Sequence, residues 1–269
     1  MTEERNNETL DEAVEKLPNG VKLAWGIVKP SSRGPKGELS IAKIVQAAIA
    51  IADRDGLAAV SMNRVATSLG FSAMSLYRYV SSKDDLLVLM QDEVCADFIP
   101  PEQADGDWRV NLRTYVKMTM SVFLDHPWYG DIPVSGAPLT PNNLRIVDWA
   151  LRQLRKLPLN DYEKMSFVLL LSSYARAIGM IARDIDQAVR KGANPDSITG
   201  SNYTAALKNL VKPDSYPYLY PLVMSGVYTE EHPGDNPVGD DFDFGLERIL
   251  DGIKSYLERK KDADPAFKE

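Results

Sequence analysis

Apolar residues recur at every third or fourth position over much of the chain, which is the spacing of helices that bury one face. The first clear run lies between Ser40 and Gly56, with apolar positions at Ile41, Ile44, Val45, Ala48, Ile51 and Ala52. Serine favours a helix N-cap, and glycine tolerates the left-handed backbone that often ends a helix. The pattern therefore predicts a helix with one buried face over residues 41–55.

Three more helices are predicted in quick succession. The second helix begins at Ser61 and ends at Gly70, with Val65, Ala66 and Leu69 facing inward. The third begins at Ser72, and its Leu76 and Val80 lie four residues apart on one face. The fourth begins at Ser82, carries Asp84 and Asp85 in its first turn, and has an apolar stripe of Leu86, Leu89, Met90, Val94 and Phe98. Acidic side chains in a first turn complement the helix dipole, which supports this start.

Helical patterns resume after the Pro- and Gly-containing break at residues 100–107. They cover residues 108–124, 142–157, 161 to about 190, 203–211 and 242–258. There is no internal repeat and no persuasive strand hairpin. We therefore expect an all-α fold with a leader (1–37, flexible), a three-helix N-terminal domain (38–84), a larger C-terminal helical domain (85–260) and a tail (261–269).

The second and third helices are separated by a short turn with a glycine and are preceded by a long helix, which is a helix-turn-helix arrangement. In such a motif the N-terminal half of the second helix enters the major groove of DNA. With Leu76 and Val80 inward, Met74, Ser75 and Arg78 face outward and Tyr77 and Tyr79 lie at the flanks. Spacing alone leaves ordinary helix packing equally open.

Overall charge argues against nucleic-acid binding, because the 269 residues carry a net charge of −7 and the pI is about 5.1. Residues 33–83 are different: seven basic residues against three acidic ones give a local balance of +4. An acidic body would be repelled by phosphates and would orient the basic face toward a duplex.

Composition narrows the remaining classes. The chain is 44% hydrophobic and 26% charged, as expected for a soluble globular protein. No apolar run reaches the roughly 18 residues of a membrane span, and residues 1–15 lack the apolar core of a signal peptide. The single cysteine, Cys95, excludes an intrachain disulfide and fits a reducing compartment. We expect a cytoplasmic protein with no membrane partner.

Enzyme chemistry has little support in the sequence. His126 and His232 each precede a proline, and neither belongs to a recognisable metal set or triad. Neither a G-x-G-x-x-G motif nor a P-loop is present. We expect no catalytic residue, no cofactor and no metal.

The segment from Gly56 to Leu87 closely resembles the signature of the TetR (tetracycline-repressor-like) family. The specific part is Leu76-Tyr77-Arg78-Tyr79-Val80 followed by Lys83-Asp84-Asp85-Leu86, and the resemblance covers residues 38–95. It implies a DNA-binding helix-turn-helix.

The resemblance also implies individual roles. Ser61, Met62, Asn63 and Arg64 match the start of the support helix, where phosphates and an occasional base are met. Ser72, Ala73, Met74 and Ser75 match the base-reading end of the recognition helix. Tyr77, Tyr79, Arg78 and Lys83 match phosphate-contacting positions, with a base contact also open to Arg78. Ala73 and Met74 depart from members with hydrogen-bonding residues there, so direct readout is expected to rest on Asn63, Ser75 and Arg78. Arg33 and Lys36 either enter the minor groove as an arm or belong to a disordered linker.

A looser resemblance extends to the tetracycline-repressor-type C-terminal domain, through segments such as His126-Pro127-Trp128 and Phe242-Asp243-Phe244-Gly245-Leu246. It implies a small-molecule pocket and a dimer built as a four-helix bundle from residues 161–190 and 242–258. The family's metal-ligand histidine has no secure counterpart. The expected pocket residues are Phe98, Tyr115, Met118, Thr119, Val122, Trp149, Phe167, Leu170 and Tyr174. The expected dimer residues are Ile178, Ile181, Ile185, Val189, Leu246, Ile249, Leu250 and Ile253. For each of these residues, a place in the core of a single chain is the alternative.

Together these observations predict a homodimeric transcriptional regulator that binds a pseudo-palindromic double-stranded DNA operator as a repressor and is released by a small-molecule effector. Two alternatives stay open. One is an activator of the same fold, and the other is a helical-bundle enzyme or scaffold that has lost DNA binding.

Overall fold

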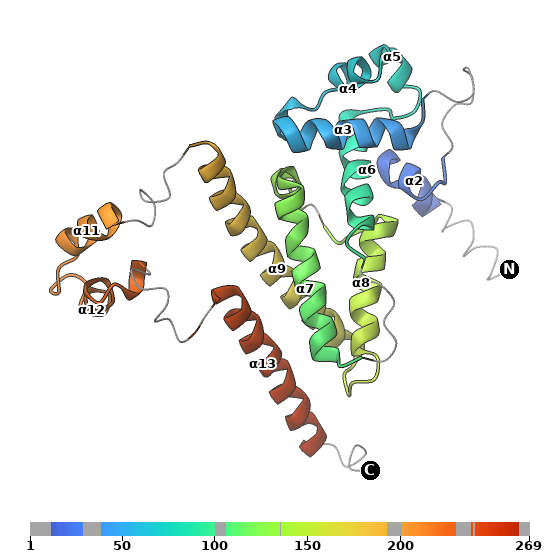
Figure 1. The fold of residues 1–269 in the computed structure, drawn as a ribbon. Coiled ribbons are helices and arrows are strands. Elements are labelled where there is room, and N and C mark those ends of the chain that lie inside the picture. Colours follow the sequence, from blue (N-terminus) through green and yellow to red (C-terminus); the bar gives the residue numbers. More distant parts are fainter. Residues whose placement is uncertain are drawn as a thin grey trace. The chain divides into compact units, whose positions relative to one another are not determined.

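The structure is a computed structural model that describes residues 12–28, 39–99, 106–134, 136–192, 201–229, 238 and 240–263. Within these ranges every regular element is a helix and there is no strand, which confirms the all-α prediction (Figure 1). The described residues up to Gly179 form one compact unit and those from Met180 onward form a second.

The N-terminal part of the first unit contains α3 (Ile41–Asp55), the 3-10 turn Leu57–Ala59, α4 (Met62–Ser68), α5 (Ala73–Leu76) and α6 (Lys83–Ala96). All four predicted serine N-caps are present, because the hydroxyls of Ser40, Ser61, Ser72 and Ser82 each accept the backbone N–H three residues later. A cap of this kind satisfies an N–H that has no partner inside its helix and stabilises the helix by about 1 kcal/mol.

The core of this part is formed by the inward faces that the periodicity predicts. Val65 on α4, together with Leu76 and Val80 of the third predicted helix, is completely buried. They pack with buried residues of α3 and α6 into one apolar cluster, which also takes in Val122, Trp128 and Ile132 from farther along the chain. The helix-turn-helix and the beginning of the C-terminal body therefore share a single core.

The third predicted helix is shorter than its pattern indicated. Only Ala73–Leu76 is α-helical, and residues 77–79 form turns. The backbone N–H of Val80 still donates to the Leu76 carbonyl at 2.9 Å, so the chain keeps the direction of a helical turn and buries Val80 as predicted.

The prediction of a flexible leader over residues 1–37 is wrong for residues 19–24. Asn19–Ala24 form helix α2, which packs along α6 (Figure 1). Val21 and Leu23 are buried, and they belong to the one apolar island of the otherwise polar leader. Arg33 and Lys36 lie outside the described residues.

The rest of the first unit contains α7 (Trp108–Asp125), the 3-10 turn Pro127–Asp131, α8 (Pro141–Leu154) and the first part of α9 (Asp161–Arg190). Helix α8 packs against both α6 and α7. Its N-cap, Thr140, makes no side-chain cap. The cap is supplied by the buried Asp92 of α6 instead, whose carboxylate accepts the backbone N–H of Asn142 at 2.8 Å.

The second unit contains the last part of α9, α11 (Ser201–Leu210), α12 (Tyr220–Met224), the 3-10 turn Val227–Thr229 and α13 (Asp241–Ala263). Helix α12 was not predicted, because two prolines and three tyrosines in residues 216–221 hide any helical period. Helix α13 extends five residues beyond the predicted end at 258, through a charged segment without an apolar stripe.

Candidate DNA interface and effector region

The turn between α4 and α5 has the geometry of a helix-turn-helix. Gly70 adopts φ +77°, the left-handed conformation that the sequence predicted for it. The N–H of Phe71 reaches back to the Ala66 carbonyl at 2.9 Å, and α4 packs directly against α5. The turn is therefore tight enough for α5 to pack against α4.

The outward face of the recognition segment matches the prediction from the helical wheel. Met74 is 72% exposed, and Tyr77 and Arg78 are exposed beside it. Ser75 is half-buried, and its hydroxyl lies 3.0 Å from that of Ser72, which also caps the helix. Base reading by Ser75 therefore competes with a hydrogen bond already made inside the motif.

The start of α4 offers less side-chain chemistry than its sequence suggested. Met62 is only 6% exposed and belongs to the apolar cluster, so its side chain is unavailable to DNA and only its backbone amide remains for a phosphate. Asn63 and Ser61 are exposed. A DNA contact by Met62 would therefore be made by its backbone amide, because the side chain at this position fills the core.

Arg64 is exposed but held by a neighbouring carboxylate. Its guanidinium forms a very short ion pair with Asp55 at the end of α3, and Arg54 pairs with the same carboxylate at 2.9 Å. The hydrogen bond from Arg54 and the charges of both arginines hold the pKa of Asp55 below its ordinary value. Asp55 thus stays charged and fixes the orientation of Arg64 beside the expected phosphate path.

The far edge of this face is formed by the start of α6. Lys83 is the first residue of α6 and is exposed. Tyr79 is half-buried and packs on the core, so its ring is rigidly placed while its edge stays accessible. The exposed polar and cationic residues from Asn63 to Lys83 therefore lie on α4, on α5 and at the start of α6.

Comparison with known proteins assigns this arrangement. Residues 44–90 match the family described as bacterial regulatory proteins, tetR family, and residues 100–257 match the tetracyclin repressor-like, C-terminal domain. The chain belongs to the TetR family. It is a DNA-binding transcriptional regulator with a helix-turn-helix, in a family that is not enzymatic.

Relatives of this TetR-family chain include the repressor DrrR1 of Streptomyces coeruleorubidus, which is 32% identical over 90% of this chain and 87% of its own length. The repressor Rv1353c of Mycobacterium tuberculosis is 25% identical over 86% of each protein. Among solved structures, ActR of Streptomyces coelicolor in complex with actinorhodin has a TM-score of 0.66 and 28% identity, covering 81% of this chain and 97% of that one. The apo form of ActR has the same TM-score and covers 83% of this chain and 99% of its own.

The predicted effector residues of this TetR-family protein lie mainly between α6, α7, α8 and the first part of α9. Phe98, Tyr115, Val122 and Trp149 are buried; Met118, Thr119, Phe167 and Tyr174 are half-buried. Leu170 is exposed on the single chain, so it does not lie in the interior with the other predicted effector residues. Of this set, Tyr115 has the best-defined polar contact: its hydroxyl lies 2.7 Å from that of Ser172, and burial raises its pKa.

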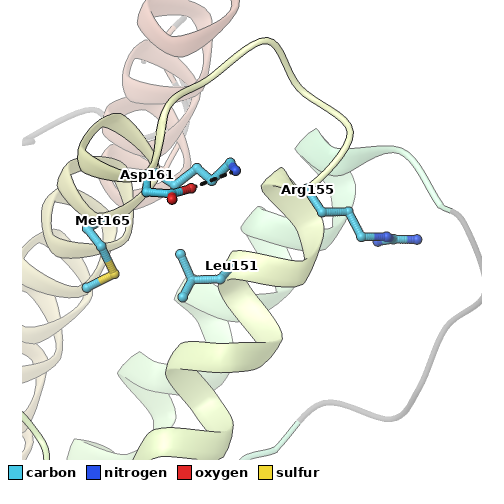
Figure 2. Close-up of a pocket in the computed structure, with 5 residues that line it drawn as sticks. Leu151, Arg155, Asp161 and Met165 are labelled. Atoms are coloured by element: carbon cyan, nitrogen blue, oxygen red, sulfur yellow. Dashed lines mark hydrogen bonds and ion pairs between the residues drawn. The ribbon is translucent and has the colours of Figure 1, made fainter. Parts of the chain in front are cut away.

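A separate cavity of about 230 Å³ lies between the end of α8 and the start of α9. It is lined by Leu151, Arg155, Asp161, Lys164 and Met165, and Asp161 pairs with Lys164 across its edge (Figure 2). None of the predicted effector residues lines it. It is also smaller than the roughly 300–1,000 Å³ of typical small-molecule sites.

The structure also reveals a contact that the sequence did not predict. Asp53 on α3 accepts a hydrogen bond from the indole N–H of Trp128 at 2.6 Å, and its Oδ1 lies 2.8 Å from Nδ1 of His126. His126 and Trp128 were noted as a family-like motif, but no sequence pattern pairs them with a carboxylate 73 residues earlier. This contact fastens the end of α7 to the DNA-binding helices.

Among the described residues, no group of three or more potential metal-ligating side chains is present.

Helix α9 carries exposed apolar side chains along its length. Leu169 is 67% exposed in its first part. Ile181, Ile185 and Val189 lie four residues apart in its last part and form an exposed apolar stripe. By length and composition α9 would also be apolar enough to cross a membrane, a test that buried core helices of soluble proteins pass as well.

The predicted dimer residues of α13 differ from those of α9. Leu246, Leu250 and Ile253 are already buried in the single chain, whereas Ile178 and Ile249 are half-buried. Among the predicted dimer residues, the ones exposed on the single chain are therefore Ile181, Ile185 and Val189 of α9.

Proposed function

We propose that the protein is a homodimeric repressor that binds a pseudo-palindromic DNA operator and is released from it by a small-molecule effector. The observation that carries the proposal is the exposed face from Asn63 to Lys83 on a folded helix-turn-helix of the TetR family. Repression is supported by the relative DrrR1, a transcriptional repressor. A cytoplasmic location follows from the same role.

Release by a small molecule is supported by the ActR structures, which contain actinorhodin or (S)-DNPA. In this chain the buried Tyr115, with its hydroxyl beside that of Ser172, provides a polar anchor in an otherwise apolar interior. Pockets for small molecules combine apolar walls with a few placed polar groups, which fits this arrangement.

The path from effector to DNA is proposed to run through α8 and α6. The N-terminus of α8 is capped by Asp92 of α6, so a shift of α8 moves α6 with it. Helix α6 begins at the expected phosphate contact, Lys83. A ligand acts on such a system only through its different affinities for the DNA-binding and released states.

Dimerisation is supported by the apolar face of α9. The exposed stripe of Ile181, Ile185 and Val189 is larger than an isolated exposed residue on a monomer's surface. The other half of the proposed bundle would come from α13.

The test is a selection of double-stranded DNA from a randomised library by the purified full chain, followed by a gel shift with the selected duplex. We expect a palindromic consensus, strong loss of affinity with added salt, and release of the duplex by a compound found in a ligand screen that begins with actinorhodin. Failure to enrich any duplex at low salt would refute DNA binding. Enrichment of a sequence without two-fold symmetry would refute the dimeric operator.

A further inference from the structure

Helix α2 lies against α6 and has no counterpart in the predicted three-helix DNA-binding domain. It is only six residues long, and its N-cap is Pro18, which makes no side-chain cap. An isolated helix of this length is unstable in water because helix nucleation is costly. Its stability must therefore come from the surface on which it lies.

That surface is the first two turns of α6. The backbone N–H of Gly20 donates to Oδ1 of Asp85 at 2.7 Å, so a carboxylate of α6 replaces the cap that α2 lacks. The other oxygen of Asp85 accepts the hydroxyl of Ser82 at 2.8 Å. Both oxygens of one carboxylate thus join α2 to the residue that caps α6.

The approach of the two helices depends on glycine. A Cβ atom at Gly20 would lie 2.9 Å from Cα and from the carbonyl oxygen of Asp85, both of them backbone atoms that cannot yield separately. Beside it, the side-chain amide of Asn19 donates to the hydroxyl of Ser81 at 3.0 Å. Helix α2 therefore contacts this segment at both of its ends, through the side chains of Ser81 and Asp85.

The opposite end of α2 is also anchored. The indole N–H of Trp25 donates to the carbonyl of Leu139 at 2.8 Å, in the loop that leads into α8. Because α8 is itself capped by Asp92, α2 is fixed by contacts with two elements of the same unit. Its position is set by the body of the protein and not by DNA.

We propose that α2 is a positioning element for DNA binding, in which Asn19 and Gly20 fix the two ends of the segment from Ser81 to Asp85 so that Lys83 meets the phosphate backbone. This role rests on the proposed operator binding. Lys83 lies between the two residues that α2 contacts, Ser81 and Asp85, is exposed, and comes three residues after Val80 at the end of the recognition segment. A charge-assisted contact to phosphate is strong only when its geometry is maintained.

The experiment compares full-length Gly20→Ala, Asn19→Ala and Lys83→Ala variants with the double variants that combine each α2 change with Lys83→Ala. The probe is the duplex that the wild-type chain selects from a randomised library. The matched control is Ile27→Ala, because Ile27 lies just beyond α2 and is exposed. Each variant is measured for duplex affinity at several salt concentrations, and for thermal unfolding.

We expect Gly20→Ala to weaken duplex binding by about tenfold, the scale of one hydrogen bond to a charged group, and to flatten the salt dependence as Lys83→Ala does. Asn19→Ala should have a smaller effect of the same kind, and Ile27→Ala none. Added to Lys83→Ala, neither α2 change should weaken binding further, because the contact that it positions is already gone.

A purely structural role for α2 gives a different pattern. The α2 variants would then melt at lower temperature, but below that temperature they would bind the duplex as the wild type does, or their losses would multiply with that of Lys83→Ala. Either result would overturn the proposal while leaving operator binding intact. If the wild-type chain selects no duplex, operator binding itself fails.

Discussion

Asp92 of α6 is buried and accepts the backbone N–H of Asn142, the second residue of α8, at 2.8 Å. The side-chain amide of Asn142 also donates to the carbonyl of Asp92 at 3.1 Å. Two hydrogen bonds, both donated by Asn142 and both accepted by Asp92, thus join the start of α8 to the side of α6. A motion of α8 is therefore transmitted to α6 through this contact.

Replacing Asp92 with alanine removes the cap of α8 and the link to α6. We expect the free energy of unfolding to fall by about 1–2 kcal/mol, the usual cost of losing an N-cap. Duplex affinity should change little, because DNA contacts lie elsewhere, but release of DNA by an effector should need more ligand. Urea unfolding measures the first effect and a gel shift with added ligand measures the second.

The outcome for Asp92→Ala is informative in both directions. Arg145→Ala is a suitable control, because Arg145 donates to the side-chain oxygen of Asn142 from the exposed side of α8 and does not contact its backbone N–H. A variant that lost stability yet kept the wild-type response to effector would show that this cap has no part in coupling.

Met62 and Met74 provide a matched pair in the DNA-binding motif. Met62 is buried in the core and Met74 is 72% exposed. We expect Met62→Ala to lower the free energy of unfolding by about 2–5 kcal/mol, as is usual for a buried methionine. Met74→Ala should leave stability unchanged and alter preference at one base pair, since an apolar side chain reads thymine methyl groups.

Denaturation and a repeated duplex selection distinguish the two methionines. If Met74→Ala selects the wild-type consensus with equal affinity, this residue contacts no base. If Met62→Ala unfolds at the wild-type urea concentration, the side chain is not part of the core.

How far the sequence could predict this molecule depends on the range of the interaction. The serine caps and Gly70 were predictable because capping and left-handed turns depend on a few neighbouring residues. Leu76 and Val80 were predictable because a helical period places them on one face. The burial of Met62 could not be predicted in this way, because a residue at the first helical position has no preceding turn to show which side it faces.

The contacts that join distant parts were not predictable. Asp53 meets Trp128 and His126 only because α3 and the end of α7 come together in space, and nothing near Asp53 in sequence indicates it. Helix α2 was hidden for the same reason. Its cap comes from Asp85, 65 residues away, so a local search for capping residues finds only Pro18.

The exposed face of α9 leads to a prediction about assembly. Ile185→Glu places a charge in the apolar stripe, where a second copy would have to bury it without a partner. We expect this variant to be monomeric and to lose operator binding, because each half-site would then be met by a single subunit. Light scattering after gel filtration measures the mass directly.

Tyr218→Glu is the control for Ile185→Glu. Tyr218 is 90% exposed but lies outside α9, so the same charge there should leave both the mass and operator binding unchanged. If Ile185→Glu keeps the mass of a dimer, the second subunit is held by another surface.

Cys95 gives a prediction on pH. Its thiol is buried, lies 3.6 Å from the Tyr129 hydroxyl and donates to the side-chain oxygen of Asn143 at 3.4 Å. Burial raises its pKa to about 12 from an ordinary value of 9.0. The folded protein therefore keeps a proton that the unfolded chain loses above pH 9, and the stability contributed by this group is lost as pH rises from 9 toward 12.

Two measurements check this behaviour. Because only the thiolate is nucleophilic, iodoacetamide at pH 8 should leave native Cys95 unmodified and should alkylate it once the chain is unfolded in urea. The free energy of unfolding should fall between pH 9 and 10.5, and a Cys95→Ala variant should show a shallower fall over the same interval. The residual slope in that variant is assigned to Tyr129 and Tyr115, whose pKa values are also raised by burial. Rapid alkylation of the folded protein, or an identical slope in wild type and variant, would mean that the thiol reaches solvent and that α6 opens at this point in the native state.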